Sequence, residues 1–181
     1  VLAPCYIEHL YNTMKETDAD ISVSGVLPFE DRNGVSSVYK RKWKDAAHNS
    51  GITRLFDSEN AIIDILYMNN MTVSAFGKLY KTSYFTEILY PAGKLYEDIG
   101  TTVALFNKAY QIAFTEYQDY FYRIRKGSIQ QSGFSSKQMD LVDNLELFRP
   151  LIYTQYPRAI PAYKSKMVSA AFNLYMKIDL R

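Results

Sequence analysis

The segment YPAGKLYEDIG, residues 90–100, contains two adjacent acids, Glu97 and Asp98, where an apolar helical pattern begins. Free backbone N–H groups and the helix dipole favour acids in a first helical turn, and this alone accounts for the pair. A carboxylate that faces a pocket from a helix start can also act as a general base. Gly93 allows a ligand to approach the backbone closely, and Tyr90, Pro91 and Tyr96 would supply a wall. The spacing is consistent with both interpretations.

A second group of chemically useful residues lies in YRIRKGSI, residues 122–129. On a strand, Arg123 and Arg125 share one face because side chains alternate with a period of two. Guanidinium groups suit phosphate oxygens, and the following Gly127 and Ser128 add backbone and hydroxyl donors. The alternative is a solvated basic strand end. Among the segments of this chain, this one is the best suited to bind phosphate.

Two further patterns have ordinary explanations. In FGKLYKTSYF, residues 76–85, Lys78 and Lys81 lie among aromatic residues, as surface lysines often do. Asp18 and Asp20 match the short Asp-x-Asp pattern that binds a divalent metal beside a nucleotide diphosphate. The pattern is common and falls between a predicted helix and a predicted strand, so we interpret it as a turn.

Composition excludes several classes of function. The chain has 181 residues, of which 48% are hydrophobic and 22% charged, which is typical of one globular domain with a sizeable core. A net charge of +2, spread along the chain, does not indicate nucleic-acid binding. Cys5 is the only cysteine, and His9 and His48 are the only histidines, so we predict no disulfide and no metal site. No apolar run reaches the roughly 18 residues of a membrane span.

Hydrophobic periodicity predicts alternating helices and strands. The predicted helices cover 4–17, 58–68 with Ser58 as N-cap, and 97–108 with an apolar seam of Ile99, Val103, Phe106 and Tyr110. The predicted strands cover 21–27, 52–56, 111–115 and 120–125, with 73–80 as strand or extended chain. Two packing helices are predicted to finish the chain, one marked by Leu141, Leu145, Phe148 and Ile152, the other opened by Pro161 with a stripe of Met167, Ala170, Ala171, Leu174 and Ile178.

Taken in order, four segments resemble the C-terminal half of family 2 glycosyltransferases with the GT-A fold, especially bacterial enzymes that build capsular and other cell-surface polysaccharides. These segments are ADISVSG, SAFGKLYKTSYF, YPAGKLYEDIG and YFYRIRKGSI. The resemblance covers roughly residues 1–135. It differs from the usual pattern at Phe76, where relatives often have Trp, and at Ala92, where they often have Glu.

The resemblance implies an α/β fold: the acceptor-side part of a GT-A nucleotide-diphospho-sugar transferase, with a mixed sheet, flanking helices and a helical C-terminal tail. Residues 1–135 would form this half and residues 136–181 the helical extension. The helix LAPCYIEHLYNTM resembles the helix that follows the metal-binding Asp-x-Asp loop. The nucleotide-binding half would therefore precede this chain. Mg²⁺ or Mn²⁺ would be bound mainly by that half, and this chain alone would be inactive.

The resemblance also implies roles for individual residues. Asp98 would deprotonate the acceptor hydroxyl in an inverting transfer of a sugar, from a UDP-sugar or similar donor to a growing cell-surface polysaccharide. Arg125 and Ser128 would lie near the diphosphate, where a cation offsets the charge on the leaving group. The predicted substrate-binding residues are Glu97, Lys78, Tyr96, Arg125 and Ser128, and no metal ligand is predicted in the chain.

Two alternatives stay open. Sixteen tyrosines and ten phenylalanines could form a platform for a non-catalytic glycan-binding or assembly module. The basic residues near position 125 could instead build a phosphate-binding regulatory domain. The resemblance further implies a cytoplasmic location, with peripheral association at the inner membrane face, and exposed sheet edges would favour a homo-oligomer.

Overall fold

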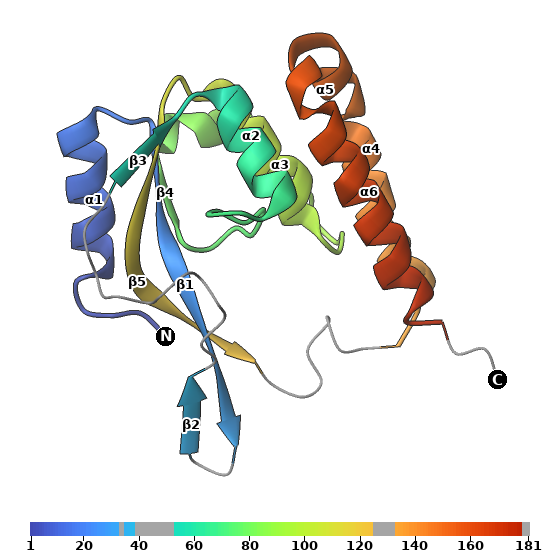
Figure 1. The fold of residues 1–181 in the computed structure, drawn as a ribbon, viewed down its shortest axis with the longest axis horizontal. Helices are drawn as coiled ribbons and strands as arrows, with labels where there is room; N and C mark the ends of the chain where they lie inside the picture. The colour runs from blue at the N-terminus through green and yellow to red at the C-terminus, as the bar shows by residue number, and fades with distance from the viewer. Residues whose placement is uncertain (33–34, 39–52, 125–132, 179–181) are drawn as a thin grey trace.

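The structure, a computed structural model, describes residues 1–32, 35–38, 53–124 and 133–178. A mixed sheet forms its centre, in which the strands follow the order β2-β1-β5-β3 and β4 pairs with β1 (Figure 1). The strands are β1 (Ile21–Arg32), β2 (Val35–Val38), β3 (Thr53–Phe56), β4 (Lys78–Tyr80) and β5 (Ile112–Ile124).

The parallel pair β1 and β5 is the longest ladder of the sheet. It runs from Ile21 opposite Ile112 to Glu30 opposite Ile124, with a register shift between Ser24 and Val26. We predicted two separate strands over the region of β5, and this was wrong. The ladder with β1 resumes after the irregularity, so one long bent strand replaces the two short ones.

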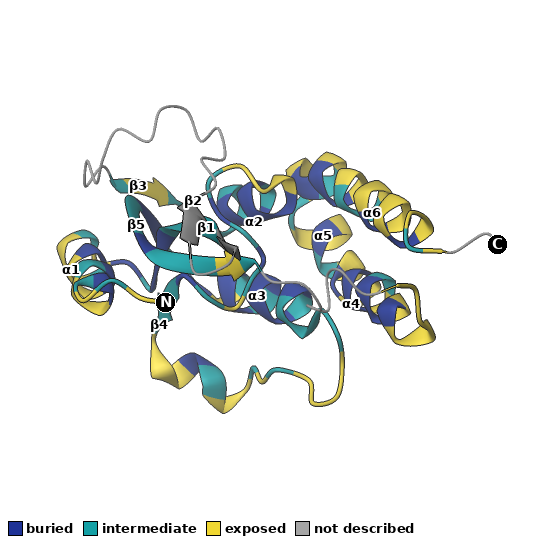
Figure 2. Ribbon diagram, turned by 90° about the horizontal axis from the view of Figure 1, so that it is seen from below, coloured by how far each residue is buried: buried dark blue, intermediate teal, exposed yellow. Residues whose placement is uncertain are grey.

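Helices cover both faces of the sheet. The α-helices are α1 (Tyr6–Thr17), α2 (Ser58–Tyr67), α3 (Glu97–Lys108), α4 (Asp140–Leu147), α5 (Arg149–Gln155) and α6 (Ile160–Tyr175). Short 3₁₀ turns span Thr82–Thr86, Ser136–Met139 and Pro157–Ala159. Helix α1 packs on one face, α2 and α3 cover the other, and α4–α6 form a further layer outside α2 and α3 (Figures 1 and 2).

One hydrophobic core joins the sheet to the outer helical layer. Its fully buried members include Ile21, Phe106 and Ile112 around the sheet, and Leu145 and Ile152 in the C-terminal helices. Burial of such side chains, at roughly 25 cal/mol per Å², is the main stabilising contribution to the fold. The C-terminal helices are therefore packed into the same core as the sheet, while the predicted division at residue 135 stays a prediction.

Helix α3 matches its predicted bounds, but the predicted seam is wrong at its end. Ile99, Val103 and Phe106 are buried, whereas Tyr110 is 87% exposed. The helix ends at Lys108, and Ala109 turns to an extended conformation with ψ 139°. Tyr110 therefore leaves the helical projection that would have buried it.

The C-terminal helices also differ from the prediction. The first predicted helix is divided at Phe148, whose φ and ψ are −100° and 4°. Pro150 lies in the first turn of α5, where its missing N–H cannot continue the helix from Glu146. In α6, Ala170 and Leu174 are buried as predicted, but Ala171 is exposed, and so is Ile178, which lies beyond the end of the helix.

Aspartate residues lie at the start of α2 and at the end of α1. The N-cap of α2 is Asp57 rather than Ser58, because the Asp57 Oδ1 accepts the N–H of Asn60 at 2.8 Å. The predicted turn at residues 18–20 is confirmed: Asp18 has φ 53° and ends α1. Asp20 accepts the N–H of Tyr110 at 2.7 Å.

The outward face of α6 is largely exposed (Figure 2). Its exposed hydrophobic residues are Val168, Phe172, Tyr175 and Met176. None of the helices that the structure describes combines the length and the apolar character needed to cross a membrane.

Candidate active site

Asp98 lies in the first turn of α3, directly after Glu97. Tyr96 precedes the helix in a left-handed conformation with φ 56°, and no side chain caps the helix at that position. The backbone N–H groups of Asp98 itself and of Ala75 in the preceding loop lower the pKa of this carboxyl. A carboxylate near free N–H groups is common in the first turn of a helix.

The surroundings raise the pKa of Asp98 above its ordinary value of 3.8. Burial is the largest cause and the neighbouring Glu97 charge adds to it, while the two N–H groups and Lys78 act in the opposite direction. A partly buried acid with a raised pKa is a better proton acceptor than an exposed one. Within the described part of the chain, no cation lies within ion-pair distance of Asp98.

The loop that contacts Asp98, residues 73–77, is held on several sides. Lys78 Nζ donates to the carbonyl oxygen of Ser74 at 2.6 Å and lies 3.4 Å from that of Phe76. Thr102 Oγ1 donates to the carbonyl oxygen of Val73 at 2.8 Å, which joins the loop to α3. The loop ends at Gly77, where φ is +77°. A side chain there would be strained, so glycine suits the turn.

Lys78 therefore lies at the predicted site, with a role that its sequence position did not indicate. Burial lowers the pKa of Lys78 to about 7, and the charge of Asp98 acts in the opposite direction. Its ammonium group donates to the loop residue before Ala75 and lies near the carbonyl of the residue after it. Lys78 thus holds this loop, and its predicted substrate-binding role stays a prediction.

Aromatic side chains lie beside the carboxylate. Tyr90 is partly buried, and burial and the nearby Asp98 charge both raise its pKa. Its ring stacks on Phe85 with 6.3 Å between centroids. Burial also raises the pKa of Tyr96, which is partly exposed and precedes α3. Tyr90 therefore lies within reach of the Asp98 charge, and the predicted aromatic wall stays a prediction.

Helix α4 holds the segment before Asp98, which we did not predict. Asn144 Nδ2 donates to the carbonyl oxygens of Leu95 and Tyr96, at 2.8 and 3.1 Å. Asp140 accepts hydrogen bonds from Lys94 Nζ at 2.8 Å and from the Leu95 N–H at 3.0 Å. These bonds stabilise the left-handed turn that starts α3. The C-terminal helices thus position the site as well as packing against it.

Lys166 of α6 is a second residue that sequence reasoning missed. It is partly buried; burial lowers its pKa, and the charge of Asp98 acts to raise it. Its Nζ lies 3.3 Å from the Sδ of Met68, at the end of α2. A helical pattern alone could not reveal Lys166, because its proximity to Asp98 depends on how α6 packs against α2.

The predicted phosphate-binding residues are not placed by the structure. Arg125 and Ser128 lie outside the described residues. Arg123 lies in β5, opposite Phe29 of β1, and it has interactions of its own. The predicted roles of Arg125 and Ser128 stay predictions.

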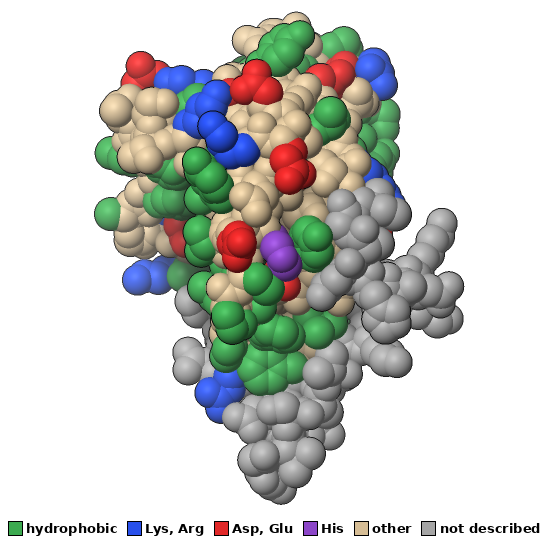
Figure 3. All heavy atoms as spheres, turned by 90° about the vertical axis from the view of Figure 1, so that its left-hand side faces the viewer, with side chains coloured by type: hydrophobic (Ala, Val, Ile, Leu, Met, Phe, Trp, Pro, Cys, Tyr) green, Lys and Arg blue, Asp and Glu red, His purple; other side chains and the backbone are tan. Residues whose placement is uncertain are grey.

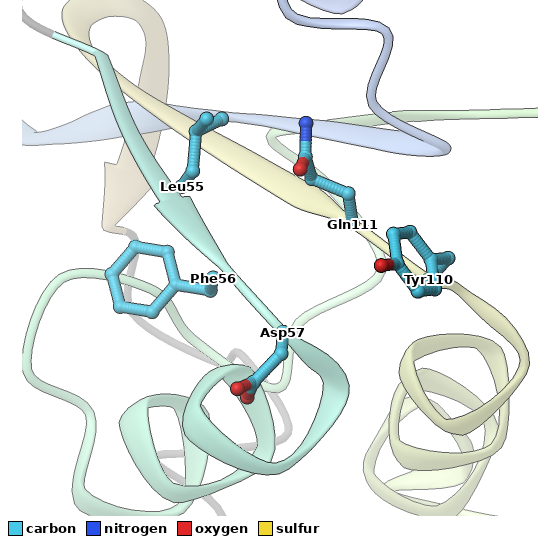
Figure 4. Close-up of a pocket in the computed structure, with 5 residues that line it drawn as sticks. All are labelled: Leu55, Phe56, Asp57, Tyr110 and Gln111. Atoms are coloured by element: carbon cyan, nitrogen blue, oxygen red, sulfur yellow. The ribbon is translucent and has the colours of Figure 1, made fainter.

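The structure also has a pocket at the opposite end of α3. It is lined by Leu55, Phe56, Asp57, Tyr110 and Gln111 (Figure 4). The polar groups in it serve the fold: Asp57 caps α2, and Gln111 Nε2 donates to the carbonyl oxygen of Thr17 at 2.6 Å. A helix the length of α3 separates the two ends by about 18 Å, so this pocket and Asp98 are different places.

This chain is similar in sequence to glycosyltransferases of one bacterium. It is 27% identical over 142 residues to glycosyltransferase GlyA of Streptococcus pneumoniae serotype 4, covering 76% of this chain and 20% of GlyA. Over 138 residues it is 25% identical to glycosyltransferase GlyG of the same organism, covering 76% of this chain and 45% of GlyG. No family model matches.

The chain resembles known glycosyltransferases in sequence and in fold. Its structure superposes on Staphylococcus aureus TarS 1–349, solved in complex with UDP-GlcNAc, with a TM-score of 0.67 and 17% identity. The match covers 99% of this chain and 50% of TarS. The predicted fold, a mixed sheet with flanking helices shared with bacterial glycosyltransferases, is confirmed. The chain spans half or less of the length of each of these relatives.

Proposed function

We propose that this chain forms the acceptor side of a glycosyltransferase that uses a nucleotide-diphosphate sugar, with UDP-sugars as the first donors to test. The sequence similarity to GlyA and GlyG supports sugar transfer, and the fold match supports the same class. TarS was solved with UDP-GlcNAc, which makes that nucleotide-sugar a reasonable first probe.

The observation that carries the proposal is the environment of Asp98. Its carboxylate is partly buried, has a raised pKa, and forms no ion pair within the described residues. Two lysines with lowered pKa, Lys78 and Lys166, carry charges that act on it. Burial that shifts both kinds of group away from their ordinary pKa is typical of functional sites.

In the proposed step, the acceptor hydroxyl oxygen attacks the anomeric carbon as the bond from that carbon to the diphosphate oxygen breaks. The nucleoside diphosphate leaves with the electron pair, and the hydroxyl proton passes to Asp98. A single displacement of this kind inverts the configuration at the anomeric carbon. Glu97 would help to orient the acceptor, with Tyr90 and Tyr96 beside the sugar ring, and Arg125 and Ser128 would contact the diphosphate.

The metal of the proposed reaction is Mg²⁺ or Mn²⁺. The Asp18 and Asp20 pair does not fit such an ion, because Asp20 already pairs with Lys81 and accepts backbone N–H groups. We therefore assign the metal to no residue described here and keep it as a proposal for the protein that carries this chain. Family 2 membership, the growing cell-surface polysaccharide, the cytoplasmic location, membrane association and self-association belong to the same proposal.

Turnover by the full-length protein would test the proposed function. The protein is incubated with a panel of UDP-sugars, Mg²⁺ or Mn²⁺, and polysaccharide acceptors, and release of UDP is measured. We expect Asp98→Asn to lose about 10²- to 10⁴-fold in turnover, the usual contribution of a general base. Asp18→Asn is the matched control, because asparagine tolerates the left-handed conformation of residue 18. Full activity of a folded Asp98→Asn protein would refute the role of Asp98.

The same assay distinguishes the two alternatives. A glycan-binding module would bind the acceptor without releasing UDP, and Asp98→Asn would leave that binding unchanged. A phosphate-binding regulatory domain would bind nucleotide through residues near Arg125 and release no UDP. Either result in a folded full-length protein would replace the transferase proposal.

A further inference from the structure

Cys5, His9 and Asp119 form a cluster on the α1 side of the sheet. His9 Nδ1 lies 2.6 Å from Asp119 Oδ2, and Cys5 Sγ lies 3.9 Å from Asp119 Oδ1. One ligand atom from each residue lies within 4.8 Å of the other two. We predicted no metal site because a single cysteine and scattered histidines give no pattern in the sequence. The fold brings the three together from the start of α1 and from β5.

A helix, a backbone hydrogen bond and a ring contact position the side chains of this cluster. Cys5 immediately precedes α1 and His9 follows one turn later, so both side chains lie on the same side of the helix. The preceding residues are bound to β5: the Ala3 N–H donates to the carbonyl oxygen of Asp119 at 2.9 Å. The His9 ring stacks on Tyr117, with 3.9 Å between centroids. The backbone of Cys5 and the ring plane of His9 are therefore fixed without any metal.

Asp119 is the most informative member, because it is buried with only 4% of its surface exposed. Among the described residues, the ion-pair partner found for it is His9, with no lysine or arginine in that role. A buried carboxylate without a permanent cation is costly, and a bound cation is one way to compensate it. His9 is 27% exposed, which leaves the cluster accessible from solvent. The face in Figure 3 shows a histidine at the surface among acidic and hydrophobic side chains.

We propose that Cys5, His9 and Asp119 bind a borderline transition-metal ion of the Zn²⁺ class. A thiolate, an imidazole and a carboxylate are three accepted zinc ligands, and a water molecule would complete four-coordination. With a thiolate and a carboxylate each contributing one negative charge, a divalent ion makes the site neutral. The thiolate also disfavours Mg²⁺ and Mn²⁺, which prefer oxygen ligands, so this site is distinct from the metal of the proposed transfer reaction.

Binding requires small movements and defined proton changes. Ligand atoms around tetrahedral zinc lie about 3.5 Å apart, so the cluster must contract on its Cys5 side and open between His9 and Asp119. The thiol releases its proton to solvent. The proton between His9 Nδ1 and Asp119 is also released to solvent, and the imidazole that binds through Nδ1 is neutral, with its hydrogen on Nε2. Metal affinity should therefore rise with pH.

Such an ion would fasten α1 to β5 and would stabilise the folded chain in proportion to its occupancy. The direct test uses Co²⁺ as a spectroscopic substitute on the full chain, together with Zn²⁺ in thermal unfolding. Cys5 is the only thiol, so a thiolate-to-cobalt charge-transfer band can arise in the monomer only from this residue. We expect one equivalent of Co²⁺ to produce that band and Zn²⁺, but not Mg²⁺, to raise the Tm.

Variants separate this site from chance binding. Cys5→Ser should abolish the band and the Tm increase, and His9→Gln should weaken Co²⁺ binding at least tenfold. Glu8→Gln removes an exposed carboxylate next to His9 on the same helix and should change neither. Absence of the band at excess Co²⁺, or equal affinity of His9→Gln and Glu8→Gln, would overturn the proposal. Circular dichroism of each variant confirms that the fold is intact, so a lost band reports ligation.

Discussion

Two groups of acidic and lysine side chains lie near Tyr96: Asp98 with Lys78 and Lys166, and Asp140 with Lys94. The pKa values of the two groups are shifted in opposite directions. At Asp98, burial raises the carboxyl pKa and lowers the pKa of Lys78 and of Lys166. At Asp140, the hydrogen bond to Lys94 lowers the carboxyl pKa and raises that of the lysine. Desolvation is the largest cause of the pKa shifts in the first group. In the second group, the largest cause is the hydrogen bond between the acid and the lysine.

This difference is the basis for proposing Asp98, rather than Asp140, as the proton acceptor. Asp140 and Lys94 form a direct pair at 2.8 Å, so both groups keep their charges over a wide pH range and hold the loop. Asp98 forms no ion pair within the described residues, and burial raises its pKa. A carboxylate in that state can accept a proton, whereas one in a direct ion pair with a lysine is a poor base.

The largest expected effect is the contrast in activity between Asp98→Asn and Asp140→Asn. If Asp98 is the base proposed above, Asp98→Asn should reduce UDP release by about 10²- to 10⁴-fold. Asp140→Asn keeps Asp98 in place and can still accept the Leu95 N–H, so its loss should be far smaller. Steady-state assays of the full-length protein measure both. Equal losses in two folded variants would end the distinction between the two groups.

The next effect concerns the loop that Lys78 holds. Lys78→Met removes the 2.6 Å bond to the Ser74 carbonyl and a charge near Asp98, so we expect about a tenfold loss in turnover. Lys81→Met is the control, because Lys81 follows closely in the sequence but pairs with Asp20 instead. If the two variants behave alike, Lys78 does not position the base.

A smaller effect is expected at Lys166. Removing its charge should raise the pKa of Asp98 further, so the acidic limb of the pH–rate profile should move to higher pH in Lys166→Gln. Lys164→Gln, an exposed neighbour on the same helix, should leave that limb in place. The profile of kcat against pH is the measurement, and an unmoved limb would show that the charge of Lys166 does not reach the base.

The smallest effect is on stability, and its sign differs between the two acids. Asp98 has a raised pKa when folded, so its contribution to the free energy of unfolding is fully present below pH 3.8 and is lost as pH rises through the folded pKa. Asp140 has a lowered pKa, so its contribution is present above pH 3.8 and is lost as pH falls through the folded pKa.

Urea unfolding at several pH values would detect this difference. The stability of the wild type relative to Asp98→Asn should decrease with rising pH, and that relative to Asp140→Asn should increase. Identical trends for the two variants would show that their environments do not differ in the way described here.

Much of the fold could be predicted because its signals are local. The bounds of α3 followed from an apolar repeat that begins at an acid pair. Prediction failed where two local choices were equally good. Asp57 and Ser58 both suit an N-cap, and the Ser58 hydroxyl instead donates to the carbonyl oxygen of Ala109. Arg125 and Ser128 lie outside the described residues, so their predicted roles are not tested.

The sequence by itself predicted the main helices, the approximate positions of most strands and the resemblance to glycosyltransferases, because these depend on residues close together in the chain. It also singled out Asp98, whose catalytic role stays a prediction. The tertiary structure alone decided that Asn144 and Lys166 lie near that acid. It also decided that Cys5 and His9 lie beside Asp119, and that the single strand β5 replaces the two strands predicted in its region. Periodicity and turn chemistry act over a few residues. Burial, pKa shifts and ligand clusters arise from segments far apart in the chain, which only packing brings together.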